Sequence, residues 1–102
     1  MASRLELHDE LCELLGTNNV YFQPPESSKI NYDCIVYHRD NFHIRHANDN
    51  KYMLMDRYEL EFIYRDPDSE IPKNILEHFK YCSFDRHFIS DNLNHDTFDL
   101  YY

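Results

Sequence analysis

Residues 52–64 alternate between two kinds of side chain, and this alternation constrains the fold more than any other feature. The even positions are mostly apolar or aromatic, whereas Arg57, Glu59 and Glu61 occupy odd positions. Successive side chains of a strand point to opposite faces, so a period of two predicts a long strand with one charged face. The other face is apolar and requires a second layer to cover it.

Two segments have the 3.6-residue period of helices that can supply this layer. Residues 3–15 place leucines at helical intervals, and Gly16 follows as a suitable end of the helix. The second helix is expected after the turn "RDPDSE", with Ser69 or Asp68 as its cap. The apolar stripe of this second helix is formed by Ile71, Ile75, Leu76 and Phe79.

The remaining patterned segments predict further strands. "VYFQ" (20–23) predicts a short edge strand, because Pro24 and Pro25 stop it and proline has no N–H to donate to a sheet. "YDCIVYH" (32–38) is continuously apolar and predicts a central strand. The polar segment 39–51, rich in Asn and Asp, is expected to form a long loop between strands.

Two strands are expected at the end of the chain, over 82–90 and 96–102, joined by a turn at "DNLNH". The order is then α-β-β-β-α-β-β. This order predicts a single α+β domain over residues 1–102, with two helices packed on one face of a mainly antiparallel sheet.

Composition narrows the possible functions. The chain has 102 residues, 42% of them hydrophobic, which suffices for one core without a metal or disulfides. Its formal net charge of −9 disfavours binding to nucleic-acid backbones and to anionic membranes. No segment has the apolar length of a membrane span or a secretion signal. Cys12, Cys34 and Cys82 lack metal-ligand spacing, so we expect free thiols in a reducing compartment.

Groups that resemble metal sites are better explained in other ways. His43 and His46 are three residues apart, near His38 and Asp49, but they share a face only if the segment is helical. We expect solvated histidines there and no metal. The acids Asp66, Asp68 and Glu70 lack the rest of a calcium loop, and we assign them to the start of a helix.

One group of acids and histidines has the composition of an acid–base pair. Asp85, His87, His95 and Asp96 are expected to meet across the last hairpin. Nothing in the sequence resembles an activated nucleophile beside them, and a phosphate-binding loop is excluded because the chain has a single Gly. We therefore expect polar cross-strand pairs, no enzyme activity and no cofactor.

Nine tyrosines are more than one small core accommodates, and tyrosine is enriched at protein interfaces. The chain ends on "DLYY", and Tyr101 and Tyr102 are therefore interface candidates.

Three stretches together resemble the small tail-terminator proteins of tailed phages, also called tail-completion, head–tail joining or minor capsid proteins. They are "LHDELCELLGTNNVYFQPPESSKINYDCIVYHRD", "YELEFIYRDPDSEIP" and "CSFDRHFISDNLNHDTFDLYY". The resemblance covers nearly the whole chain and implies an α+β protein whose copies form a ring, typically of six. Such a ring caps the tail tube and joins it to the head connector, and no catalytic residue is implied.

The resemblance gives expectations for partners and surfaces. The partners are further copies of the chain, the tail tube protein and the head–tail connector protein, while DNA passes through without specific binding. The location is the tail or neck of the virion, and the host cytoplasm before assembly. Glu59 and Glu61 are candidates for an acidic lumen wall. Phe42 and Ile44, in the expected loop, are candidates for contact with the tube or connector.

Three alternatives stay open at this point. An acidic mimic of DNA, inhibiting a host DNA-binding protein, is compatible with the net charge. A neck-ring head-completion protein has a similar expected fold. A small metallo-hydrolase built on the histidines is the third.

Overall fold

The computed structural model describes residues 4–26, 28–47 and 50–102, and for residues 41–47 and 50–55 it describes the backbone alone. In chain order the elements are α1 (Arg4–Leu15), β1 (Val20–Phe22), β2 (Cys34–Ala47), β3 (Asn50–Tyr64), α2 (Ile71–His78), β4 (Cys82–Ser90) and β5 (Leu93–Tyr101). The predicted order of helices and strands is confirmed. Neither helix is long and apolar enough to span a bilayer.

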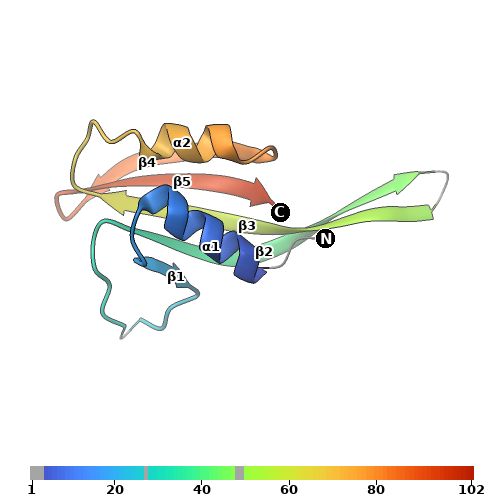
Figure 1. The fold of residues 1–102 in the computed structure, drawn as a ribbon, viewed down its shortest axis with the longest axis horizontal. Helices are drawn as coiled ribbons and strands as arrows, with labels where there is room; N and C mark the ends of the chain where they lie inside the picture. Colours follow the sequence, from blue (N-terminus) through green and yellow to red (C-terminus); the bar gives the residue numbers. More distant parts are fainter. Residues whose placement is uncertain (1–3, 27, 48–49) are drawn as a thin grey trace.

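The five strands form one sheet in the order β1-β2-β3-β5-β4 (Figure 1). β1 lies at one edge, as "VYFQPP" predicts, and it runs parallel to β2. All other neighbours are antiparallel, so the sheet is mainly antiparallel as expected.

Both helices pack on one face of the sheet. Leu7 and Leu11 of α1 and Ile75 of α2 are fully buried, and they belong to the same apolar cluster as Phe62 and Phe98 from the centre of the sheet. Burying a side chain of this size stabilises a fold by about 1.5–3 kcal/mol. The alternation over residues 52–64 therefore correctly predicted which face of β3 the helices cover.

The two helix ends differ in how well the sequence predicted them. Gly16 follows α1 with a positive φ of 83°, and its N–H bonds the carbonyl of Cys12. At α2 the expected cap was wrong by one or two residues, because Glu70 occupies that position. Ser69 instead accepts a hydrogen bond from the N–H of Ile71 at 3.3 Å.

Two predicted boundaries were also wrong. The expected loop over 39–51 is mostly strand, since β2 continues to Ala47 and β3 begins at Asn50. β5 begins at Leu93 rather than at residue 96, because the turn needs only Asp91 and Asn92. These two residues have φ angles of 52° and 64°, the pair of positive values that a tight two-residue hairpin requires.

Candidate functional site

The most unusual feature of the fold is the far end of the hairpin formed by β2 and β3. β5 pairs with β3 only from Arg57 onward, and β1 pairs with β2 only over residues 35–37. Residues 43–47 and 50–55, here called the arm, therefore pair with each other alone in the described ladders. Figure 1 shows the arm extending beyond the helices and the other strands, along the 50 Å long axis of the molecule.

The arm is rich in apolar residues for a two-stranded ribbon that leaves the body. Isolated two-stranded ribbons are marginally stable in water. An apolar ribbon beyond the core is typical of a segment that contacts another protein. The apolar and aromatic residues of the segment 41–55 are Phe42, Ile44, Ala47, Tyr52, Met53, Leu54 and Met55.

The two interface candidates in this segment, Phe42 and Ile44, lie outside the residues whose side chains are described. Their backbone lies in a strand and not in the expected loop, paired with Asp56 and Leu54 respectively. The side chains of His43 and His46 are likewise outside the described residues, and their segment is not the helix that a shared metal face requires.

The second feature is the sheet face opposite the helices, here called the open face. The register places His38, Glu59 and Asp99 in one row across β2, β3 and β5. Glu61 lies in the next row, and its side chain, like that of Glu59, is about one-third exposed. The predicted charged face of the long strand is therefore present, and neither described helix covers it.

Ion pairs organise the charges of the open face. Arg57 pairs with Asp99 at 3.2 Å and with Asp40 at 3.6 Å, while His38 lies 3.8 Å from Glu59. The hydrogen bond that Arg57 donates to Asp99 and the charge of Asp40 raise the pKa of Arg57 above its ordinary value. Carboxylate oxygens of Asp40, Glu59 and Asp99 lie within 4.8 Å of one another, and two of these acids, Asp40 and Asp99, pair with Arg57. The cluster is acidic on balance.

The predicted group of two acids and two histidines is only partly brought together. His87 pairs with Asp96, but Asp85 bonds Thr97 at 3.1 Å, and His95 faces Glu61 at 3.3 Å on the open face. The group is split because β4 has a bulge between Phe84 and Arg86, and strand parity distributes the rest over two faces.

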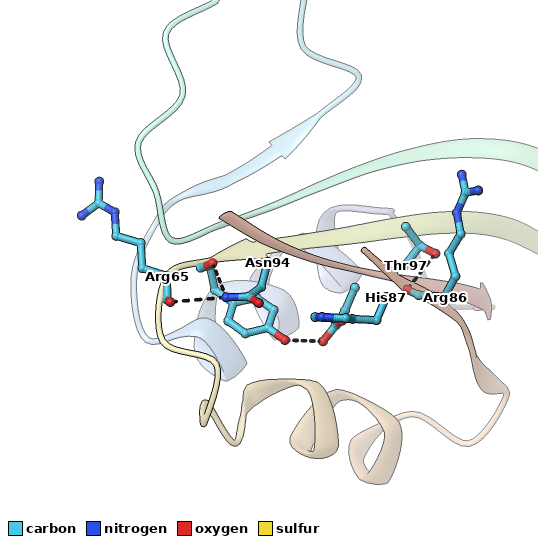
Figure 2. A network of polar contacts seen from close by, with 7 residues as sticks. Arg65, Arg86, His87, Asn94 and Thr97 are labelled. Atoms are coloured by element: carbon cyan, nitrogen blue, oxygen red, sulfur yellow. Dashed lines mark hydrogen bonds and ion pairs between the residues drawn. The ribbon is translucent and has the colours of Figure 1, made fainter. Parts of the chain in front are cut away.

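His87 and Asp96 instead belong to a polar network under α2 (Figure 2). Asp96 is only 4% exposed and accepts a hydrogen bond from the Tyr64 hydroxyl at 2.8 Å. Burial, together with this bond to a carboxylate, raises the pKa of Tyr64. Asn94 extends the network by donating to the backbone carbonyl of Arg65 at 3.3 Å. The network connects the end of β3 with β4 and β5.

The two C-terminal tyrosines have different surroundings. Tyr101 is partly exposed, and the register pairs it with Arg57 on the open face. The Tyr102 hydroxyl donates a hydrogen bond to Glu10 of α1. The rings of Tyr102 and Phe79, beside α2, pack edge to face with their centroids 6.1 Å apart. Tyr102 therefore fastens the end of the chain to its own helices, while the interface role of both residues stays a prediction.

The three cysteines are free thiols, as the sequence predicts. Cys34 is fully buried, and burial near Glu61 raises its pKa from 9.0 to about 12. The corresponding pKa of Cys82 is raised to about 11, again chiefly by burial.

Because burial raises the pKa of these thiols, we expect the free energy of unfolding to fall at alkaline pH. A buried thiol stays neutral while the unfolded thiol ionises, so the contribution of Cys34 is complete below about pH 9 and is lost as the pH rises towards 12. The free energy of unfolding should fall above pH 9 with a slope approaching about 1.4 kcal/mol per pH unit from Cys34. Urea titrations between pH 8 and 10.5 measure this slope. A Cys34→Ala variant should have a shallower slope, and an unchanged slope would contradict the assignment.

Comparison with known proteins yields no relative from which a function can be transferred. No protein-family model, curated protein or solved structure matches the chain. The arm and the open face are therefore the features that bear on its function.

Proposed function

We propose that the chain is a non-enzymatic assembly protein of tailed phages, whose copies form a ring that caps the tail tube and joins it to the head connector. The observation that carries this proposal is the arm, an apolar two-stranded ribbon that leaves the body and pairs only with itself in the described ladders. Such an element contributes little to a lone chain and much to an assembly.

The direction of the arm favours a ring. In this proposal the arm reaches a different surface on its neighbour, which is a head-to-tail contact. Repeated head-to-tail contacts form a ring when their rotation closes. Six copies is the number that the resemblance of the sequence implies.

The open face suits the wall of a channel that carries DNA. Glu59, Glu61 and Asp99 make it acidic, and acidic walls repel phosphates and keep the duplex mobile. In this proposal the helices face outward and the open face lines the lumen.

Reversing the charge of this wall tests that arrangement. In phage carrying Glu59→Lys and Glu61→Lys together, particles should assemble, but DNA ejection should be slowed about tenfold or more at low salt, because the new cations bind phosphates. Added salt should restore the rate, since it screens these contacts. The control is Glu26→Lys with Glu70→Lys, which makes the same charge change at exposed sites of the body. Normal ejection at low salt from the Glu59 and Glu61 variant would contradict a lumenal open face.

The proposed location has a direct test. Gold-labelled antibodies against the chain should decorate virions at the junction of head and tail. Label on the capsid shell, or virions without label, would contradict the proposal. If virions carry no label, capture of a host DNA-binding protein from infected cells would favour the acidic DNA mimic.

A further inference from the structure

The sheet has two edges, and they differ in how far they are protected against pairing. β1 forms one edge, and it is only three residues long and ends shortly before Pro24 and Pro25. Short strands and prolines are common ways to prevent edge pairing. β4 forms the other edge with nine residues, and in the described ladders it pairs on one side only, with β5.

The β4 edge exposes apolar side chains to water, which is unfavourable for a single copy of the chain. Phe84 is 47% exposed and Ile89 is 69% exposed, although both lie on the helix-covered side of the sheet. A long edge with exposed apolar residues is a template for another strand.

The bulge in β4 determines which strand can pair there. Before the bulge, Cys82 and Phe84 lie on the helix side, and after it His87 and Ile89 do, because their partners on β5 alternate regularly. The extra residue, Asp85, bonds Thr97 and so lies on the open side, as does Arg86 beside it. The bulge thus shifts the face parity of β4 by one between its two halves.

This shift makes β4 complementary to itself. When two copies of β4 run antiparallel with Asp85 opposite Arg86, Phe84 lies opposite His87 and Cys82 lies opposite Ile89. Every opposed pair then projects from the same face, as antiparallel pairing requires. Shifting the register by one residue places helix-side residues opposite open-side residues. When the shifted register is centred on Arg86, the two copies of Arg86 also lie opposite each other, and their like charges repel.

We propose that β4 is a homodimer interface, in which two copies join antiparallel through this register into one continuous sheet. The occupant of the edge is a second copy because the charges are self-complementary, with two Asp85–Arg86 pairs related by the twofold axis. Ile89 of each copy then extends the apolar layer beside Cys82 of the other. The exposed apolar area of Phe84 and Ile89 becomes partly covered.

This inference does not depend on the proposed function. A twofold contact closes on two copies and does not by itself produce a ring. In the dimer, the β4 edge of each copy is paired. The tests of the dimer are independent of the tests of the role in the virion.

Cross-linking tests the register directly. In an Ile89→Cys variant, the new thiol lies opposite Cys82 of the second copy, and mild oxidation should give a covalent dimer on a non-reducing gel. The wild type and an Ile89→Cys variant that also carries Cys82→Ser should not cross-link. Ser90→Cys is the matched control, because the neighbouring residue projects from the other face. Absence of a covalent dimer from Ile89→Cys, or equal yields from Ser90→Cys, would overturn the register.

A charge exchange tests the pairing by equilibrium. Sedimentation of the purified chain should give a dimer dissociation constant that Asp85→Arg or Arg86→Asp alone weakens about tenfold, by opposing like charges. The double variant Asp85→Arg with Arg86→Asp should return to within about threefold of the wild type, since opposite charges face each other again. Circular dichroism confirms that each variant is folded. A double variant as weak as the single ones, or a wild type that stays monomeric, would overturn the proposal.

Discussion

Replacing residues 43–55 with Asn-Gly is expected to leave a folded protein that cannot assemble. The replacement keeps the pair Phe42–Asp56, and Asn-Gly is the preferred two-residue turn between paired strand residues. Asp56 retains its contacts with the body, where its carbonyl accepts from the N–H of Tyr102 and its carboxylate pairs with Arg39. The change therefore removes the arm and retains the core.

Under the proposed function, the measurement is complementation in the proposed parent phage with this gene deleted. The shortened protein should have the circular dichroism of a folded sheet and should yield at least about a hundredfold fewer infectious particles than the wild type, because heads and tails stay unjoined. A matched control is the pair Glu26→Ala and Lys29→Ala, in the surface loop of the body. Full complementation by the shortened protein would show that the arm has no part in assembly.

Truncation of Asp96 is expected to cost more stability than that of any other acid on the sheet. Asp96→Ala leaves the Tyr64 hydroxyl without its acceptor and His87 without its carboxylate. A buried group without its partner costs about 1–3 kcal/mol, and hydrogen bonds to charged groups are at the upper end. We expect the free energy of unfolding to fall by about 2–4 kcal/mol, out of about 5–15 kcal/mol for a domain of this kind.

Chemical denaturation of matched variants measures this loss. Asp99→Ala removes the same side chain from the same strand at a site where the carboxylate is 26% exposed, and it should cost about 1 kcal/mol or less. Tyr64→Phe should have an intermediate effect, because Asp96 keeps its contact with His87. If Asp96→Ala and Asp99→Ala cost the same, the network does not hold the three strands together.

The parts of the fold that could be predicted are those that local periodicity determines. The alternation of residues 52–64 predicted the buried and charged faces of β3, and leucine spacing predicted α1. Prolines after "VYFQ" predicted an edge strand. In each case the signal and its structural consequence lie within about fifteen residues, so no long-range contact was needed.

The arm was missed because its composition and its pairing give opposite signals. Asn, Asp and His in residues 39–51 favour turns, but the two strands of the long hairpin pair with each other over most of this segment. A weak alternation was present, since Phe42 and Ile44 alternate with His43 and Arg45. Cross-strand pairing of this kind cannot be read from propensity alone.

The sequence predicted which acids and histidines lie in this part of the sheet, but not which of them pair with each other. The sequence predicted that Asp85, His87, His95 and Asp96 come together, and only His87 and Asp96 do. The bulge in β4 decides this outcome, and a single inserted residue leaves no local mark in the sequence. The parallel direction of β1 was likewise set by the path of the chain rather than by its residues.

The proposed assembly role is tested most directly by electron microscopy of lysates from the proposed parent phage with this gene disrupted. We expect heads filled with DNA beside unattached tails of irregular or excessive length, because the tube then lacks its terminating ring. Full heads with unattached tails of normal length would instead assign the protein to the neck. Intact, normal virions would contradict an assembly role altogether.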